Sequence, residues 1–250
     1  LGDVYKRQAH DPASFHLLDG DKIASLATDY ISELVKQANL DIKVGCVQTA
    51  YANGASTAYL EERAPVTCTK TGVKHLHRAA EEYDIGVYFE ANGHGTVLFS
   101  PSVMVAMDLA NMKGEALSIE AVNRLRLLAK LINQTVGDAL SDLLMVLAIL
   151  STRQWDAPKW DSCYTDLPNR LTKVSVPDRT MFRTTDAERR LETPLHMQDK
   201  IDELVNKIPM GRSFVRPSGT EDCVRVYAEA ATPQDAERLV HAVEELVRTA

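Results

Sequence analysis

Apolar residues recur at helical spacing soon after the start of the chain. In the segment 22–40 they fall at intervals that place them on one side of a helix: Ile23, Leu26, Tyr30, Leu34 and Val35. This spacing is typical of an amphipathic helix with one face in a core. Asp21 stands just before the segment, and a carboxylate at that position can accept from the first backbone N–H groups. The pattern predicts a helix that Asp21 caps.

Short apolar runs and helical patterns then alternate along the chain. The runs at 43–51, 65–70, 84–90 and 95–100 have the length and composition of strands, and turn residues bound them. The segments 53–63 and 71–83 between them have helical patterns. Because strand–helix alternation is typical of parallel sheets, we expect an α/β domain with a mixed, mostly parallel sheet and flanking helices. The run at 95–100 follows an Asn-Gly turn and is expected to pair back with 84–90.

The second half of the chain begins with a long helical pattern, which is followed by a segment without regular periodicity. Residues 118–151 are helical in pattern, but Gly137 and Asp138 interrupt them, which predicts two helices with Asp138 as a cap. Residues 155–170 are rich in proline, aspartate and aromatic residues, and we interpret them as a linker. Beyond it the pattern predicts strands at 171–179, 213–215 and 223–230, and helices at 197–208 and 232–250. Thr232 is the expected N-cap of the last helix, with Pro233 at its first position. A small C-terminal α+β domain is therefore expected.

These patterns define three parts of the chain. Residues 1–13 are expected to be a non-native or disordered leader, 14–160 the α/β domain, and 161–250 the α+β domain. Because the chain starts with Leu rather than Met, we interpret it as a fragment.

Composition and charge narrow the class of function. Apolar residues make up 45% and charged residues 25%, which is typical of globular proteins, and the formal net charge is −7. An acidic chain is a poor general binder of nucleic acids or anionic membranes, and no uninterrupted apolar stretch approaches the ~20 residues of a membrane span. The four cysteines form no C-x-x-C pair. A reduced, cytoplasmic protein is expected.

The stretch 214–229 has the chemistry of an anion site. A turn between two apolar runs carries arginines, hydroxyl groups and a flexible backbone: Arg216, Pro217, Ser218, Gly219, Thr220 and Arg225. Backbone N–H groups of such a turn can form an anion nest, and an arginine fork suits two phosphate oxygens. An ordinary hairpin turn with surface charges is the alternative, and the residues leave both open.

A second polar loop follows the predicted strand at 84–90. Glu90, Asn92 and His94 cluster where a parallel strand ends, and open α/β sheets bind ligands at that edge. Carboxylate and amide groups can bind sugar hydroxyls. A simple Asn-Gly hairpin turn is the alternative.

Two further clusters have weaker signals. A basic group at a loop-to-helix junction favours an anion, although a solvated helix face fits equally well: Lys70, Lys74, His75, His77 and Arg78. Asp19 and Asp21 bracket a glycine, but the remaining ligand positions of a calcium loop are not filled, so a helix cap is favoured over a metal site. No G-x-S-x-G or Walker motif is present.

Five motifs in order resemble one known family. They are TKTGVKHLH (69–77), YFEANGHGTVLFS (88–100), YTDLPNR (164–170), TTDAERR (184–190) and FVRPSGTEDCVRVYAEA (214–230). Together they resemble the phosphoacetylglucosamine mutases of the α-D-phosphohexomutase superfamily. R-P-S-G-T marks the superfamily, while Asn92, where many relatives carry serine, points to the N-acetylglucosamine branch.

The resemblance implies an activity and a set of binding residues. The family interconverts N-acetylglucosamine 6-phosphate and 1-phosphate on the route to UDP-N-acetylglucosamine, with four domains around one cleft. By matching position, Glu90, Ala91 and Asn92 would hold the sugar, and Lys74 and His75 would add further substrate contacts. The substrate phosphate would be bound by the loop and the strand after it: Arg216, Pro217, Ser218, Gly219, Thr220 and Arg225.

The chain departs from the family in what it lacks. It contains neither the phosphoserine loop of the T-A-S-H-N-P kind nor the D-G-D-x-D loop that binds Mg²⁺ in the family. The resemblance therefore implies domains three and four of a longer enzyme, with no catalytic and no metal-binding residue in this chain and no turnover by it alone. Its expected partners are phosphorylated N-acetylglucosamine and the missing N-terminal domains. A stand-alone phosphosugar-binding module, or a fragment of a glucose or mannose phosphomutase, is the alternative.

Overall fold

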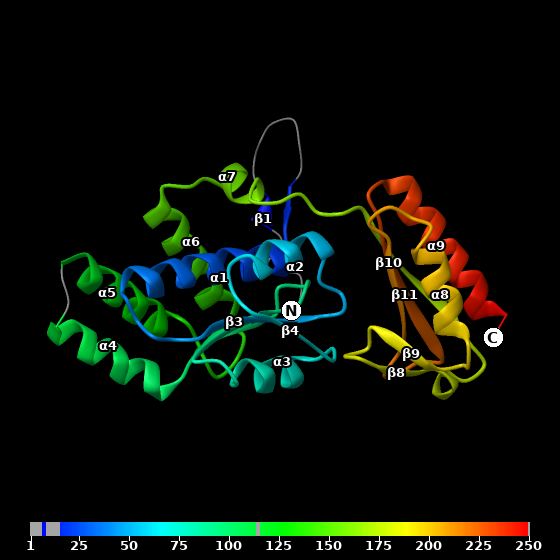
Figure 1. Ribbon diagram of the computed structural model, residues 1–250, viewed down its shortest axis with the longest axis horizontal. Helices are drawn as coiled ribbons and strands as arrows, with labels where there is room; N and C mark the ends of the chain where they lie inside the picture. Colours follow the sequence, from blue (N-terminus) through cyan, green and yellow to red (C-terminus); the bar gives the residue numbers. More distant parts are fainter. Residues whose placement is uncertain (1–6, 9–15, 114–115, 250) are drawn as a thin grey trace. The chain divides into compact units, whose positions relative to one another are not determined.

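The chain forms two compact units in a computed structural model that describes residues 7–8, 16–113 and 116–249 (Figure 1). One unit ends at Thr165 and the other begins at Asp166, a few residues beyond the expected division after residue 160. The expected leader, residues 1–13, lies outside the described residues except for strand β1 (Arg7–Gln8), which pairs with β2 (Leu17–Leu18).

A four-stranded sheet organises the N-terminal unit, in the order β4-β3-β5-β6. The strands β3 (Val44–Thr49), β4 (Val66–Thr69) and β5 (Ile85–Phe89) are parallel. The edge strand β6 (Gly95–Phe99) runs antiparallel to β5. This arrangement confirms the prediction of a mixed, mostly parallel sheet, including the pairing of the last two strands.

Helices cover both faces of this sheet (Figure 1). They are α1 (Gly20–Gln37), α2 (Gly54–Glu61), α3 (Val73–Ala80), α4 (Pro101–Lys113), α5 (Ala116–Leu131), α6 (Ala139–Arg153) and α7 (Ala157–Asp161). Val87 and Val97 pack into the main core with α1, α5 and α6, whereas Val47 and Tyr88 pack against α3. Because successive strand residues face opposite sides, β5 supplies both cores.

The first helix begins differently from the prediction. Asp19, not Asp21, is the N-cap of α1, and its Oδ1 accepts from the backbone N–H groups of Asp21 and Lys22 at 3.0 and 3.2 Å. The buried Asp21 carboxylate instead accepts from the N–H of Asn53 at 2.7 Å. Asp21 therefore joins the start of α1 to the start of α2, a tertiary role that local spacing does not indicate.

The segment interpreted as a linker lies partly in the N-terminal unit. It contains α7, whose Trp160 is buried and donates from Nε1 to the carbonyl of Lys22 at 3.0 Å. The buried Lys22 Nζ donates to the carbonyls of Asp161 and Tyr164 at 2.9 and 2.6 Å. The chain is thus fixed to α1 as far as Tyr164, and the linker interpretation is wrong for this portion.

The C-terminal unit is an antiparallel sheet with helices on one face. Its strand order is β10 (Arg212–Pro217), β11 (Cys223–Glu229), β7 (Asn169–Ser175). The helices α8 (Met197–Val205) and α9 (Pro233–Arg248) share a core with Val224, Val226 and Ala228 of β11. A 3₁₀ turn (Arg179–Met181) precedes a hairpin of β8 (Arg183–Thr185) and β9 (Arg190–Thr193). The predicted small α+β domain and the Thr232 cap of α9 are confirmed.

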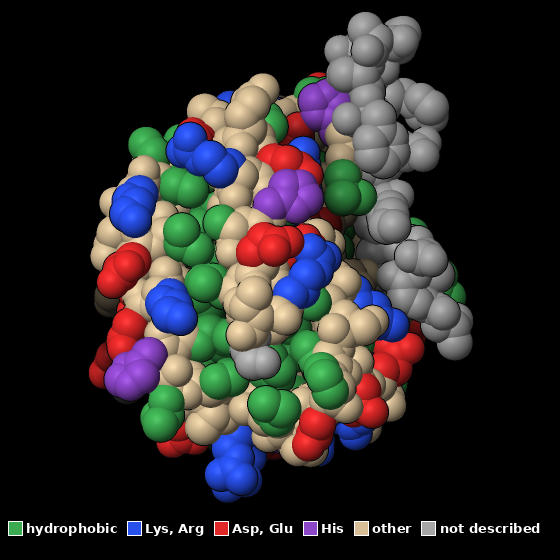
Figure 2. Space-filling model, turned by 90° about the vertical axis from the view of Figure 1, so that its right-hand side faces the viewer, with side chains coloured by type: hydrophobic (Ala, Val, Ile, Leu, Met, Phe, Trp, Pro, Cys, Tyr) green, Lys and Arg blue, Asp and Glu red, His purple; other side chains and the backbone are tan. Residues whose placement is uncertain are grey.

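The surface has both charge signs close together. Figure 2 shows one face of the molecule, on which basic and acidic side chains are interleaved with exposed hydrophobic ones. Among the described residues, none of the helices combines the length and apolar character that crossing a membrane requires.

Candidate functional site

The loop after β5 is a tight turn held by its own backbone. Gly93 donates to the carbonyl of Glu90 at 2.7 Å, and Glu90 donates to the carbonyl of His94 at 2.9 Å. The Oδ1 of Asn92 accepts from the N–H of His94 at 2.9 Å. Gly93 has a φ of 86°, which favours glycine. The Asn-Gly turn chemistry is therefore present, and it leaves the Asn92 side chain exposed.

Two glycines from other elements pack directly against this loop. Gly20, at the start of α1, donates to the carbonyl of Ala91 at 3.2 Å, and a Cβ at Gly20 would lie 1.8 Å from the Glu90 oxygen. A Cβ at Gly137 would lie 2.6 Å from Cδ2 of His94. Only glycine allows such close approach of two backbones. The loop is thus fixed from both sides by α1 and the segment before α6.

The Glu90 carboxylate connects the loop to the start of α3. Its Oε1 accepts from the N–H of Gly72 at 3.2 Å, and Gly72, with a φ of 120°, is the N-cap position of α3. Gly72 has no side chain, so the N-cap residue itself makes no side-chain capping hydrogen bond. Lys74 is exposed and His75 half-buried in the first turn. The structure therefore brings Glu90, Lys74 and His75 together at one helix N-terminus, whose partial positive charge favours anions.

His77 belongs to a different group from the other basic residues of this helix. Its Nδ1 lies 3.0 Å from the hydroxyl of Tyr88, which is buried in the sheet. Burial, followed by the nearby carboxylates of Asp142 and Glu90, raises the pKa of Tyr88 to about 12. His77 thus packs against the core, and the basic cluster expected from the sequence is divided.

Asp142, in the first turn of α6, is an unusual buried acid. Its side chain is 1% exposed, and within the described residues both carboxylate oxygens are buried without a hydrogen-bond partner. Burial, followed by repulsion from Asp138, raises its pKa to about 7. Sequence reasoning did not single out this residue, because its burial depends on how α6 meets the sheet.

The second predicted loop, in the C-terminal unit, is a hairpin connection. Pro217 is the last residue of β10, and the connection to β11 covers Ser218 to Asp222. Ser218 donates from its N–H to the carbonyl of Cys223 at 2.9 Å, which closes the hairpin. The Ser218 hydroxyl accepts from the N–H groups of Thr220 and Glu221 at 3.4 and 3.3 Å. Ser218 therefore shapes the loop, whereas Gly219 and Thr220 are exposed.

The space next to Gly219 is empty of described atoms. The φ of Gly219 is not in the left-handed region, and a Cβ at this position would meet nothing within 4 Å. Neither backbone conformation nor packing of the described residues requires glycine here. The space beside it is open to a ligand that approaches the backbone.

Three cations lie in a row across the strands next to this loop. Arg216 of β10 pairs with Arg225 of β11, and Arg225 pairs with Lys173 of β7. Directly paired residues of antiparallel strands face the same side of a sheet. Val224 and Val226 face the helices, so the cations lie on the other face. Sequence reasoning found the two arginines but missed Lys173, because the strand register was unknown.

Carboxylates accompany the two outer cations of the row. The Nε of Arg216 lies 2.8 Å from Oε2 of Glu188, and the Nζ of Lys173 lies 2.8 Å from Oε2 of Glu221. The Lys173 ammonium lowers the pKa of Glu221, and Glu221 raises the pKa of Lys173. Among the described residues, no carboxylate lies within ion-pair distance of the central Arg225. The row therefore keeps an excess of positive charge beside an open loop, as an anion site requires.

The predicted residues thus form two groups, one in each unit. The first contains Glu90, Ala91 and Asn92 with Lys74 and His75 nearby, and the second contains Arg216 to Thr220 with Arg225. Sequence reasoning missed Glu188, although its motif TTDAERR was recognised.

The described residues do not fit a metal ion. They contain no group of three or more His, Cys, Asp or Glu side chains arranged to hold one. Asp19 and Asp21 are engaged as a helix cap and as a partner of Asn53.

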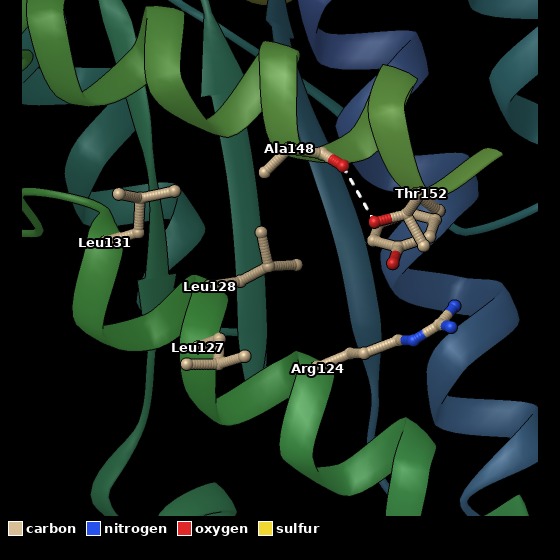
Figure 3. Close-up of a pocket in the computed structure, with 7 residues that line it drawn as sticks. Arg124, Leu127, Leu128, Leu131, Ala148 and Thr152 are labelled. Carbon is tan, nitrogen blue, oxygen red and sulfur yellow. Dashed lines mark hydrogen bonds between the residues drawn. The ribbon is translucent and has the colours of Figure 1, made fainter. Parts of the chain in front are cut away.

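A cavity elsewhere in the N-terminal unit has a different character. Leu127, Leu128 and Leu131 of α5 face Ala148 and Thr152 of α6 across a space of about 230 Å³ (Figure 3). The Thr152 hydroxyl donates to the carbonyl of Ala148 at 2.8 Å, within its own helix. The lining is mainly apolar and includes no predicted site residue, so this groove between helices is distinct from both polar groups.

Comparison with protein families matches both units. Residues 19–155 match the family described as phosphoacetylglucosamine mutase AMG1, domain III. Residues 171–246 match the phosphoglucomutase/phosphomannomutase C-terminal domain.

Curated relatives are similar along nearly all of this chain. Phosphoacetylglucosamine mutase 1 of Schizosaccharomyces pombe is 54% identical over 234 residues, which cover 93% of this chain and 45% of that protein. Phosphoacetylglucosamine mutase of Homo sapiens is 52% identical over 231 residues, which cover 92% of this chain and 43% of that protein. The chain therefore spans less than half the length of these relatives.

Solved structures have the same fold. The crystal structure of Aspergillus fumigatus N-acetylphosphoglucosamine mutase in complex with GlcNAc-6P and magnesium matches with a TM-score of 0.92 and 50% identity. The match covers 94% of this chain and 45% of that chain. With a family match over more than half of its length, this chain belongs to the phosphoacetylglucosamine mutase family of the α-D-phosphohexomutase superfamily.

Proposed function

We propose that this chain is the substrate-binding part of an enzyme that interconverts N-acetylglucosamine 6-phosphate and 1-phosphate. One observation carries the proposal: Arg216, Arg225 and Lys173 lie in one row beside the open loop at Gly219. A row of cations with a net positive charge, next to the exposed loop residues Gly219 and Thr220, suits a phosphate dianion. The relatives named above and the GlcNAc-6P bound in one of them support this substrate.

Each group of residues has a separate task in this proposal. Arg216 and Arg225 bind the phosphate that is not transferred, and the exposed Thr220 adds a hydroxyl. Glu90 and Asn92 bind the sugar, because a carboxylate accepts from hydroxyls and an amide can both accept and donate. A substrate that reacts at either end must bind in two orientations. Separate holders for sugar and phosphate therefore suit this reaction.

Phosphoryl transfer itself is assigned to other residues in this proposal. It requires a donor in line with the acceptor and neutralisation of charge on the transferred group. We propose that the phosphoserine and the Mg²⁺ site belong to the part of the relatives that this chain does not span. We also propose that the complete enzyme acts in the cytoplasm, in amino sugar metabolism leading to UDP-N-acetylglucosamine; a sequence with four cysteines and no C-x-x-C pair suits a reducing compartment.

A turnover measurement tests the division of labour. The purified chain alone is expected to convert no N-acetylglucosamine 6-phosphate to 1-phosphate. Addition of the purified N-terminal half of a relative, such as the S. pombe enzyme, should restore measurable conversion, because both halves are needed around the substrate. Turnover by the chain alone would show that it contains its own phosphoryl donor and would refute this division.

Two other functions give different results in a binding experiment. A stand-alone phosphosugar-binding module would bind GlcNAc-6P but would gain no activity with the added half. A fragment of a glucose or mannose phosphomutase would be stabilised more by glucose 6-phosphate than by GlcNAc-6P in a thermal melt, since tighter ligands raise apparent stability more. We expect the larger shift with GlcNAc-6P, because Asn92 is exposed at the sugar loop.

Gly219→Ala should separate binding from stability. A Cβ here contacts no described atom, so the melting temperature is expected to stay within about 1 °C of the parent, as for surface substitutions far from any contact. The added methyl group occupies space that a phosphate would use, and we expect GlcNAc-6P affinity to fall about threefold to tenfold, or about 0.7–1.4 kcal/mol. Titration calorimetry measures it. Unchanged affinity would mean that phosphate does not approach this backbone.

A further inference from the structure

The turn between β8 and β9 has an unusual backbone. Asp186, Ala187 and Glu188 have φ values of 50°, 55° and 69°, so three consecutive residues other than glycine lie in the left-handed region. Residues with a Cβ are disfavoured there, and such conformations persist only where surrounding contacts hold them. This turn belongs to the motif TTDAERR, and the proposed function assigns no role to any residue of that motif.

Two sets of contacts hold the turn. Arg189 binds Asp186 three times: its N–H and its Nε donate to the carbonyl at 3.1 Å, and its Nη2 donates to Oδ1 at 2.5 Å. Glu188 points to another element, where its Oε2 accepts from Nε of Arg216 at 2.8 Å. The first set closes the turn upon itself, while the second directs one carboxylate to the cation row.

The Glu188–Arg216 pair is better shielded than the corresponding pair at the other end of the row. Its side chains are 14% and 20% exposed, whereas those of Glu221 and Lys173 are 54% and 48% exposed. Exposed pairs of long side chains sample many geometries and contribute little. A shielded, charge-assisted hydrogen bond to Nε restricts the guanidinium much more.

Glu188 contacts Arg216 at Nε, and this position determines how the carboxylate orients the guanidinium. A guanidinium is planar, and its donors form a rigid fork. A carboxylate at Nε uses the side edge of the plane and thereby fixes the direction of the end edge, formed by Nη1 and Nη2. Glu188 also offsets charge repulsion between Arg216 and the neighbouring Arg225, which favours one arrangement of the row before a ligand arrives.

We propose that Glu188 is a positioning residue for the substrate phosphate, which holds the Arg216 guanidinium in its binding orientation. The inference rests on the proposed function, because it assigns Arg216 to a phosphate. It predicts that loss of Glu188 weakens phosphate binding although an acidic side chain is removed from a basic site. Simple electrostatics predicts the reverse, since deleting a negative charge near an anion site should tighten binding.

Titration calorimetry with the full chain tests the proposal. GlcNAc-6P and inorganic phosphate are titrated separately into the parent, Glu188→Ala, Glu188→Gln and the control Glu192→Ala, which removes an exposed acid from the same hairpin. Glu188→Ala is expected to raise Kd about tenfold for both ligands, because binding must then order the arginine. Glu188→Gln should stay within about threefold of the parent, since its amide oxygen still accepts from Nε. Glu192→Ala should not change Kd.

A double variant separates positioning from general damage to the fold. If Glu188 acts through Arg216, then Glu188→Ala has no further effect on Kd in an Arg216→Ala background, because the effects of coupled residues do not add. Structural damage would instead add the same factor in both backgrounds. Thermal melts of each variant show whether the folded chain is being titrated.

The possible outcomes are distinct. Tighter or unchanged binding by Glu188→Ala in a folded protein overturns the positioning role, as does an additive double variant. If the parent itself binds neither ligand, the proposed function fails and this inference falls with it. If the parent binds both ligands and Arg216→Ala weakens them while Glu188→Ala does not, only the inference fails.

Discussion

Asp142→Asn should stabilise the N-terminal unit at neutral and alkaline pH and remove part of its pH dependence. The Asp142 carboxyl is buried, and among the described residues its oxygens have no hydrogen-bond partner. Ionisation inside the protein is therefore costly, and its pKa is raised from 3.8 to about 7. The uncharged amide of Asn carries no such cost.

The sign of the effect follows from proton binding. Between pH 4 and pH 7 the folded state retains the Asp142 proton while the unfolded state loses it, so the parent loses stability as pH rises. With about 1.4 kcal/mol per pKa unit, the loss approaches about 4 kcal/mol by pH 7 and then levels off. Well below pH 3.8 both states are protonated. There, Asp142→Asn should differ from the parent by less than about 1 kcal/mol, because both side chains are neutral.

Urea unfolding followed by tryptophan fluorescence measures this effect. Both tryptophans, Trp155 and Trp160, belong to the N-terminal unit, so their signal reports the unfolding of that unit. The quantity of interest is the difference in unfolding free energy between variant and parent at each pH. Asp41→Asn, the same change at an exposed carboxylate, is measured at each pH as the matched control. A pH-independent difference for Asp142→Asn would show that Asp142 is ionised normally.

Arg216→Ala should weaken the binding of GlcNAc-6P by about 1.5–3 kcal/mol, the range for hydrogen bonds to charged groups. This corresponds to a rise in Kd of about 10- to 150-fold. Arg216 heads the cation row, and its planar fork can meet two phosphate oxygens at once. Arg216→Lys keeps the charge without the fork, so we expect it to recover only part of the loss.

Calorimetry at fixed ionic strength measures the change, since salt screens such contacts. Arg238→Ala serves as the control: it removes an exposed arginine from α9, which packs on the opposite face of the sheet. The control should bind like the parent. Equal affinities of Arg216→Ala and the parent would remove Arg216 from the phosphate site.

Local patterns predicted the elements that local contacts stabilise. Asp138 and Thr232 cap α6 and α9 as predicted, because a cap bonds to N–H groups two or three residues away. The start of α1 was misjudged, since contact between Asp21 and Asn53 decides which aspartate remains for the cap. Helix α4 was not predicted, although Pro101 at its first position is a known start signal.

The candidate site shows the same division between local and long-range information. The residues of both loops could be found from sequence, because loop chemistry and motif are local. Lys173 and Glu188 could not, since they reach the site through strand register and through a hairpin that packs beside β10. The burial of Asp142 could not be predicted from the sequence for a similar reason, because only the packed fold removes its carboxylate from water.

The contact between Gly20 and the Glu90 backbone has a consequence for genetics. Gly20 has no side chain and belongs to a helix, yet any residue with a Cβ would have to displace the loop after β5, because that atom would lie 1.8 Å from the Glu90 oxygen. In a survey of all single substitutions scored by growth, position 20 should tolerate as little variation as Glu90. A position that tolerates few substitutions therefore need not contact the ligand. At position 20, selection would act on the absence of a side chain.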